Sequence, residues 1–201
     1  MPSEPFRYRP VFGLVLSGVV VVLCVVGIWN LVAVADWWGL ARAIWPLLFA
    51  ATLVAAMFWR PRVVITDDDV TVVNVFRTFE VPWQAIERID TRYAATLYTK
   101  GHRIAVWAAP SPGIRGATTI SKRDVSNLAE SSYGPEGTVR PGDAVSSASG
   151  QVAFVLRQRW EKLRDDEALV EADRPVLVKT HRVTIVALIV LGVASLISAV
   201  V

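Results

Sequence analysis

Three consecutive carboxylates, Asp67, Asp68 and Asp69, are the clearest group of side chains in this 201-residue chain that could bind a ligand. Carboxylate oxygens suit Ca²⁺, but a calcium loop places its ligands at alternate positions so that they converge on the ion. Asp side chains also stabilise tight turns by hydrogen-bonding the local backbone. Because the three residues are directly adjacent, we expect them to form a turn between two strands and not a metal site.

Histidine and cysteine, on which many nucleophilic and zinc-dependent enzymes rely, are scarce in this sequence. His102 lies in a predicted tight turn and His181 at the edge of an apolar run, so neither supports a catalytic triad or a zinc site. Cys24 is the only cysteine and lies within an apolar run, where a packing role is expected. The chain lacks the Gly-rich phosphate-binding motifs and the G-x-S-x-G nucleophile motif. We therefore expect no enzyme activity, no catalytic residue, no cofactor, no metal and no small-molecule substrate.

Three apolar runs without charged residues indicate an integral membrane protein. Hydrophobic residues make up 53% of the chain, and the excess lies in residues 10–35, 43–59 and 183–201. A helix needs about 20 apolar residues to span the hydrocarbon core of a bilayer, with a range of roughly 17–25. The sequence therefore predicts three spans, the second only just long enough, and the lipid bilayer is the first expected partner.

The first two runs are expected to form a helical hairpin. The charged residues between them place the connecting loop at Asp36–Arg42, and Pro46 would then lie in the first turn of the second span, where its missing N–H has little effect. Cleavage of the first run as a signal peptide after Ala33-Val34-Ala35 is the alternative. That run is, however, about twice as long as the apolar region of an ordinary signal peptide, and another span follows at once.

The distribution of charge predicts which side of the cell membrane each segment occupies. Residues 62–174 carry 15 basic and 16 acidic side chains, so this segment lacks the positive charge that nucleic-acid binding requires. Basic residues instead flank the apolar runs, as is typical of cytoplasmic flanks. The N-terminus and residues 62–182 are therefore expected in the cytoplasm, with the C-terminus outside. The flanking residues are Arg7, Arg9, Arg60, Arg62, Lys179 and Arg182.

The segment between the second and third apolar runs is predicted to be a small β module. Val63–Thr66 and Val70–Phe76 are rich in β-branched residues and are separated by the acidic turn, a pattern typical of paired strands. Ala95–Thr99 and Arg103–Ala108 are expected to form a closing hairpin, with a glycine at positive φ in its turn. The residues expected to have structural roles in this module and its helix are Trp83, Ile86, Gly101, Trp107 and Trp160.

Apolar side chains recur with helical periodicity at residues 150–164, and Trp160 is the largest of them. We expect this helix to close the β module, because its polar face, on which we place Arg157, is not strongly basic as in a membrane-surface helix. Arg159 interrupts the apolar face and Phe154 lies opposite it, so these two residues are a candidate interaction pair. The alternative is that the Arg159 stem packs while its charge reaches water, and that Phe154 is simply exposed.

Residues 111–149, which precede this helix, are rich in Gly, Pro and Ser and are predicted to be a flexible insertion. A short strand at Thr118–Ile120 is the one regular element considered within it, and deletion of residues 113–147 is expected to leave the stability of the module unchanged. The predicted domains are a two-helix transmembrane hairpin at 1–60, a cytoplasmic module at 61–174 and a transmembrane helix at 175–201.

Four features of the segment together resemble the bacterial pleckstrin-homology-like (PH-like) domain. They are a Val-rich hairpin, the step Pro82-Trp83-x-x-Ile86, a Lys100-Gly101 hairpin ending in Val106-Trp107-Ala108, and a later helix carrying Arg159-Trp160. The chain is similar in particular to the actinobacterial membrane proteins called low-molecular-weight protein antigen 6, which also have two spans before the domain. The resemblance covers residues 62–109 and 150–164. It implies a strongly bent antiparallel sheet or barrel of seven strands capped by a C-terminal helix, whereas the residues here indicate six strands.

The sequence therefore predicts an α+β membrane protein. The resemblance implies a non-enzymatic, membrane-tethered interaction module on the cytoplasmic face, acting as a scaffold or accessory subunit with an unknown protein partner. One alternative is a lipid-headgroup sensor, because relatives of the fold bind phosphoinositides through basic residues around the first two strands. The corresponding turn here is Asp67–Asp69, which has the wrong sign for phosphate. The other alternative is an accessory subunit of a cell-envelope or secretion complex that acts through its transmembrane helices.

Overall fold

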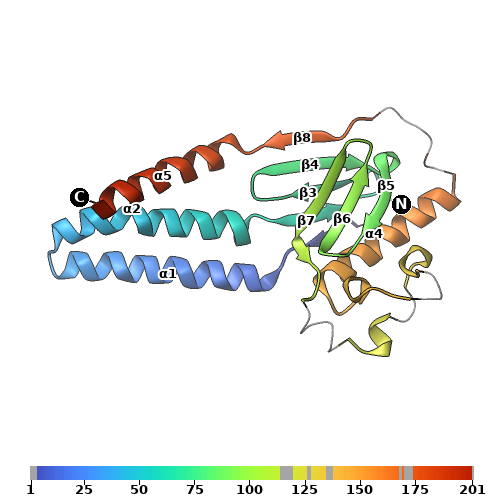
Figure 1. The fold of residues 1–201 in the computed structure, drawn as a ribbon, viewed down its shortest axis with the longest axis horizontal. Helices are drawn as coiled ribbons and strands as arrows, with labels where there is room; N and C mark the ends of the chain where they lie inside the picture. The colour runs from blue at the N-terminus through green and yellow to red at the C-terminus, as the bar shows by residue number, and fades with distance from the viewer. Residues whose placement is uncertain are drawn as a thin grey trace. The chain divides into compact units, whose positions relative to one another are not determined.

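The computed structural model describes residues 4–113, 120–125, 128–134, 138–167, 169 and 174–200. Contacts between residues divide the chain into two compact units (Figure 1). The β unit comprises Met1–Arg9, Arg62–Asn74 and Thr78–Lys179, and the helical unit comprises Pro10–Pro61, Val75–Arg77 and Thr180–Val201. Each unit is therefore assembled from segments that lie far apart in the sequence.

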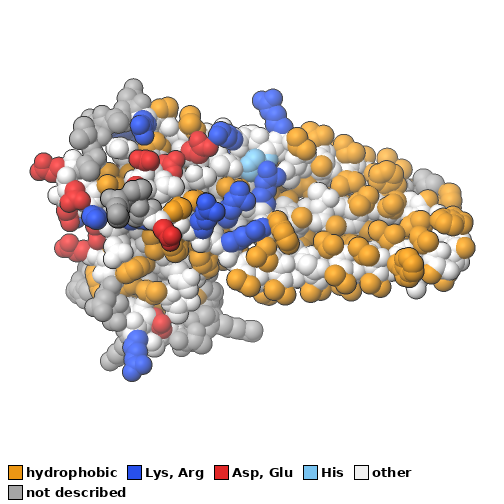
Figure 2. All heavy atoms as spheres, turned by 180° about the vertical axis from the view of Figure 1, so that it is seen from behind, with side chains coloured by type: hydrophobic (Ala, Val, Ile, Leu, Met, Phe, Trp, Pro, Cys, Tyr) orange, Lys and Arg blue, Asp and Glu red, His pale blue; other side chains and the backbone are white. Residues whose placement is uncertain are grey.

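The helical unit consists of α1 (Val11–Ala33), α2 (Trp37–Val54) and α5 (Arg182–Val200). A π-helical turn at Ala55–Trp59 continues α2, and α2 lies between α1 and α5 and contacts both (Figure 1). Three helices, Val11–Ala33, Trp37–Trp59 and Arg182–Val200, are long and apolar enough to cross a membrane. Hydrophobic side chains accordingly cover the visible face of this unit (Figure 2). The two apolar helices predicted near the N-terminus and the third near the C-terminus are confirmed.

The connection between α1 and α2 is shorter than predicted. Residues Asp36–Arg42 do not form a loop, because α2 begins at Trp37. Asp36 caps this helix, since its Oδ1 accepts a hydrogen bond from the backbone N–H of Gly39 at 2.8 Å. The expectation that Pro46 lies in the first turn was therefore wrong, because Pro46 lies inside α2. The same change places Arg42 within the helix, with consequences described below.

Two sheets form the framework of the β unit. The first contains five strands in the order β1-β2-β3-β4-β8, and its pairs β1–β2, β2–β3 and β3–β4 are antiparallel. The second is the antiparallel meander β5-β6-β7. The bounds are β1 Phe6–Tyr8, β2 Arg62–Ile65, β3 Asp69–Val73, β4 Arg77–Pro82, β5 Ile86–Asp90, β6 Ala94–Thr99, β7 His102–Pro110 and β8 Leu177–Thr180.

The strands β2 to β7 match in number the six that the sequence indicates between residues 62 and 110. Two further strands, β1 and β8, were not predicted. Their segments fall within the predicted transmembrane regions 1–60 and 175–201, and each is too short to show an alternating pattern of its own. Pairing with β2 and β4 makes them edge strands of the five-stranded sheet.

The core of the β unit lies where the two sheets and one helix meet. Helix α4 (Ala148–Asp165) packs against β5, β6 and β7, and its bounds agree with the helix predicted at 150–164. Ser147 caps α4 by accepting a hydrogen bond from the N–H of Gly150 at 2.9 Å. The core side chains that are fully buried include Val63, Ile65, Val70, Val72, Val81, Trp83, Leu97, Ile104, Val106, Val152 and Leu156.

Part of the predicted flexible insertion packs against the β unit. Of the described residues in 111–149, Asp143, Ala144 and Ser149 are all buried. A Cβ added at Gly142 would overlap the carbonyl oxygen of Thr91, so only glycine allows this segment to approach the end of β5 so closely. Two of the three residues of the short strand considered at Thr118–Ile120, residues 118 and 119, lie outside the described part of the chain.

Candidate functional site

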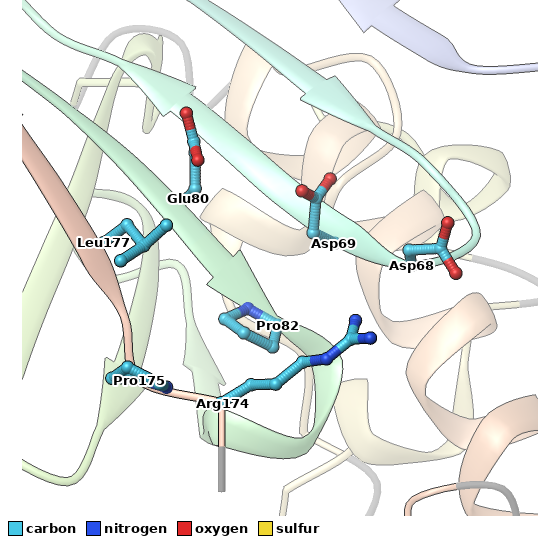
Figure 3. Close-up of a pocket in the computed structure, with 7 residues that line it drawn as sticks. All are labelled: Asp68, Asp69, Glu80, Pro82, Arg174, Pro175 and Leu177. Carbon is cyan, nitrogen blue, oxygen red and sulfur yellow. The ribbon is translucent and has the colours of Figure 1, made fainter. Parts of the chain in front are cut away.

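A groove of about 220 Å³ lies on the β unit beside β8 (Figure 3). Its charged residues come from the β2–β3 turn, from β4 and from the segment that leads into β8. Its apolar residues come from the end of β4 and from the start of β8. The charged lining residues are Asp68, Asp69, Glu80 and Arg174, and the apolar ones are Pro82, Pro175 and Leu177.

The β2–β3 turn fixes the acidic end of the groove. The hydroxyl of Thr66 donates a hydrogen bond to Oδ1 of Asp69 at 2.8 Å and accepts one from the N–H of Asp69 at 3.0 Å. Asp68 is exposed next to this anchored residue. Asp67 and Asp68 thus form the turn that the sequence predicts, and Asp69 is already the first residue of β3. Among the described residues, no group of three or more His, Cys, Asp or Glu side chains is placed to hold a metal ion.

The remainder of the groove combines carboxylates with an uncovered apolar surface. Lys179 donates a hydrogen bond to Oε1 of Glu80 at 2.6 Å and so joins β8 to β4. Figure 3 shows that the side chain of Arg174 extends past Pro82 toward the side of Asp68. Leu177 is 51% exposed although it belongs to a sheet. The groove thus places three carboxylates and one arginine around an uncovered apolar surface.

A buried ion pair holds α4 against the part of the predicted insertion that contains Asp143. Arg157 Nη1 lies 2.5 Å from Oδ1 of Asp143, and the two side chains are 6% and 2% exposed. The Arg157 guanidinium also donates to the hydroxyl of Ser132 at 2.8 Å and to the carbonyl of Ile89 at 3.3 Å. Thr91 donates to the same Asp143 oxygen at 2.7 Å. The network joins β5, the insertion and α4.

The placement of Arg157 corrects the sequence analysis, which put this residue on the polar face of the helix. The helical pattern could not reveal the burial, because its carboxylate partner lies 14 positions away in a segment expected to be flexible. The expectation for a deletion of residues 113–147 changes with it. Such a deletion removes Asp143, so we now expect it to destabilise the β unit and not to be neutral.

An exposed ion pair lies near the buried one. Arg140 Nη1 is 2.5 Å from Oδ1 of Asp90, and the Arg140 side chain is 55% exposed. Burial alone would raise the pKa of Asp90, but backbone N–H groups of Arg92 and Thr91 and the guanidiniums of Arg140 and Arg88 together hold this pKa below its ordinary value. The resulting stabilisation is present at neutral pH, and it disappears only as the pH falls through the lowered pKa.

The two predicted interaction residues lie apart from the groove lining. Phe154 is half-buried on α4. The Arg159 side chain extends from α4 to the β2–β3 turn, where its guanidinium lies 3.3 Å from Oδ1 of Asp67. The guanidinium also donates hydrogen bonds to the carbonyls of Ile65 at 3.4 Å and Glu4 at 3.2 Å. These contacts link α4 to the acidic turn and to the segment before β1. A role of Phe154 and Arg159 in binding a partner stays a prediction.

The residues expected to be structural occupy different environments. Trp83 is 1% exposed and its Nε1–H donates to the carbonyl of Thr66 at 3.1 Å, while Ile86 is buried beside it in the core. Gly101 has a φ of +106° in the β6–β7 turn. Trp160 is half-buried against the core, and the Trp107 side chain is 53% exposed.

Sequence reasoning missed the side of the groove formed by Arg174, Pro175 and Leu177. Arg174 ends the predicted module at 61–174, Pro175 and Leu177 fall in the predicted segment 175–201, and their own pattern contains no signal for a binding surface. Only the pairing of β8 with β4 brings them next to Glu80 and the acidic turn. A proline before a short apolar segment was the one available cue, since proline often precedes an edge strand.

One of three comparisons with known proteins, the comparison with family models, supports the fold that the residues indicate. Neither the comparison with curated proteins nor that with solved structures found a match. Residues 60–126 match the model of the family described as "Bacterial PH domain". This range begins just before β2, contains all of β2 to β7 and ends before α4. The chain therefore contains a bacterial PH-like domain, accompanied by three helices that are apolar enough to span a membrane.

Proposed function

We propose that this chain is a non-enzymatic, membrane-tethered PH-like module that lies on the cytoplasmic face of the cell membrane and binds a protein partner. The module comprises residues 61–174 together with the flanking strands. In this role the chain is a scaffold or an accessory subunit of a membrane complex. A PH-like domain supports an interaction role, since PH domains are typically binding modules without catalytic residues.

The observation that carries this proposal is the direct connection between the sheet and the apolar helices. Only Arg9 and Pro10 separate β1 from α1, only Arg60 and Pro61 separate the π-helical turn from β2, and only His181 separates β8 from α5. Three strands of one sheet thus continue into the three candidate spans. Such short connections keep the module close to the membrane surface, because a linker of two residues reaches only about 7 Å.

Charge favours a cytoplasmic location for the module. Five arginines and one lysine flank the ends of the candidate spans that adjoin the sheet, whereas Arg42 is the one basic residue near the opposite ends. Cytoplasmic flanks are typically enriched in such residues.

A protein partner fits the groove beside β8 better than a lipid headgroup does. Asp68, Asp69 and Glu80 place three carboxylates around an apolar surface, and no comparable basic set lines this groove in the described residues. Carboxylates repel phosphate but attract Lys and Arg side chains. We therefore propose that the partner presents a basic segment with apolar neighbours.

Site-specific photo-crosslinking in the full-length chain tests this proposal. A photoreactive amino acid at Leu177 should give a discrete protein adduct in cells, because this side chain is 51% exposed within the groove. The same probe at Tyr93, which is 71% exposed and outside the groove lining, is the matched control and should not give that adduct. Asp68→Asn should weaken the Leu177 adduct severalfold, since it removes one attractive charge.

Two outcomes would contradict the proposal. Identical adducts from positions 177 and 93 would mean that the groove has no selectivity. Adducts to phospholipid alone from Leu177, insensitive to Asp68→Asn, would favour a headgroup sensor instead.

A further inference from the structure

The helical unit contains a hollow of about 330 Å³ between α2 and α5. The lining residues on α2 include Trp38, Arg42 and Trp45, which lie on one face of the helix because they are four and three positions apart. Ile197 and Ser198, three and four positions after Ala194, line it together with Ala194 from one face of α5. Trp38, Trp45 and Ile197 are 63%, 41% and 59% exposed, so the described part of the chain leaves this face uncovered.

Arg42 gives the apolar hollow a single positive charge. Its Nε donates a hydrogen bond to the carbonyl of Ser198 at 3.4 Å. Asp36 is the only acidic residue of the helical unit, and its carboxylate caps the start of α2 at Gly39. Among the described residues, no carboxylate lies within ion-pair distance of the Arg42 guanidinium. Within the described part of the chain the two Nη groups therefore have no carboxylate partner, and they can receive an anion from outside it.

The position of Arg42 along its helix places this charge near the surface of a bilayer. Arg42 is the sixth residue of the candidate span Trp37–Trp59, so it lies about 7–8 Å from the start of the helix at a rise of roughly 1.5 Å per residue. A span of 23 residues is about 35 Å long, slightly longer than a hydrocarbon core of about 30 Å. Arg42 thus falls near the boundary between acyl chains and headgroups, where Trp side chains are also enriched.

We propose that this hollow is a binding site for one phospholipid, whose phosphate pairs with Arg42 and whose glycerol and acyl chains cover Trp38, Trp45 and Ile197. A guanidinium binds phosphate oxygens through two parallel hydrogen bonds, and a long Arg side chain near a helix end can reach the headgroup layer where lipid phosphates lie. The apolar lining suits acyl chains and not free phosphate.

This inference rests on the proposed function only in that the three helices span a membrane. It does not depend on the groove beside β8, on the partner protein or on the orientation of the spans. It also differs from headgroup binding by the β2–β3 turn, because the lipid here contacts α2 and α5 of the helical unit.

Native mass spectrometry of the full-length chain in mild detergent tests the site, with phosphatidylglycerol as the probe. The unchanged chain should retain one phosphatidylglycerol molecule, and the same amounts of diacylglycerol or inorganic phosphate should not be retained. Diacylglycerol supplies the chains without the phosphate, and inorganic phosphate supplies the anion without the chains. Both halves of the proposed contact are therefore required for retention.

Two variants separate charge from space, and a third serves as the control. Arg42→Gln should weaken retention of phosphatidylglycerol about tenfold by removing the charge. Ala194→Phe should weaken it by a similar factor by filling the hollow while leaving Arg42 intact. Trp37→Leu changes a residue that is 64% exposed and does not line the hollow, so it should retain lipid like the unchanged chain.

Equal retention of phosphatidylglycerol and diacylglycerol, or full retention by Arg42→Gln, would overturn the proposal. A lipid-free dimer that Ala194→Phe dissociates would also overturn it, because a second copy of the chain would then occupy the hollow. Alkaline carbonate extraction distinguishes this failure from a failure of the proposed function. A chain that stays in the membrane pellet but retains no lipid contradicts only the lipid site, whereas a chain released into the supernatant contradicts the membrane tether as well.

Discussion

Asp143→Ala should lower the free energy of unfolding of the β unit by about 3–5 kcal/mol, because it leaves the Arg157 guanidinium buried without its carboxylate. The Arg157 side chain is 6% exposed, so water cannot replace the lost partner without disruption of the core. Thr91 would lose its acceptor at the same time. For a unit of this size the melting temperature should fall by at least ~10 °C. Thermal unfolding of the full-length chain in detergent, followed by near-UV circular dichroism, measures the shift.

The exposed pair Arg140–Asp90 supplies the matched control. Arg140→Gln breaks an ion pair of the same 2.5 Å length, but the Arg140 side chain is 55% exposed, so the expected loss is about 0–1 kcal/mol. The double variant Asp143→Ala/Arg157→Met should recover part of the stability, because it removes the buried charge that the single variant leaves unpaired. Equal melting temperatures for Asp143→Ala and Arg140→Gln would show that burial of the Arg157–Asp143 pair has no energetic consequence.

Trp83→Ala should destabilise the β unit by a similar amount, about 3–5 kcal/mol, through the cavity left by the largest fully buried side chain. Trp83 is 1% exposed, and its Nε1–H donates to the carbonyl of Thr66, next to the acidic turn. The loss should therefore also loosen the turn that carries Asp68 and Asp69. The same unfolding experiment measures the stability, and the Leu177 crosslink reports on the turn.

Trp107→Ala is the control for this variant, since the same residue type is removed from a position that is 53% exposed. Its expected effect is within about 0.5 kcal/mol, as for most surface substitutions. Trp83→Phe should lie between the two, because it keeps most of the packing and loses the hydrogen bond to Thr66. A Trp107→Ala variant as unstable as Trp83→Ala would contradict the assignment of the core.

Periodicity and composition carried enough information to predict the apolar helices, the strands β2, β3, β6 and β7, and α4. Long charge-free runs have few alternative structures, and buried residues alternate with less buried ones at the start of β3, where Val70 and Val72 are buried and Thr71 between them is less so. Helix α4 was predictable because its apolar residues recur over four turns. These elements depend mainly on their own sequence.

The features that could not be predicted depend on partners far away in the chain. Strands β1 and β8 have only three and four residues, and pairing with β2 and β4 makes them strands. The burial of Arg157 depends on Asp143 in a loop, and the groove depends on β8 lying beside β4. The start of α2 was misplaced because Arg42 interrupts a charge-free run, although Asp36 is an ordinary N-cap residue that indicates the earlier start.

The orientation of the chain in the membrane tests the central claim most directly, and the single cysteine makes the measurement simple. In a Cys24→Ala background, Tyr93→Cys marks the PH-like domain and Val34→Cys marks the turn between α1 and α2, and the two native side chains are 71% and 64% exposed. In intact cells, a membrane-impermeant maleimide should label Val34→Cys, and it should label Tyr93→Cys only after the membrane is permeabilised. Labelling of Tyr93→Cys in intact cells, with Val34→Cys protected until permeabilisation, would contradict a cytoplasmic PH-like module.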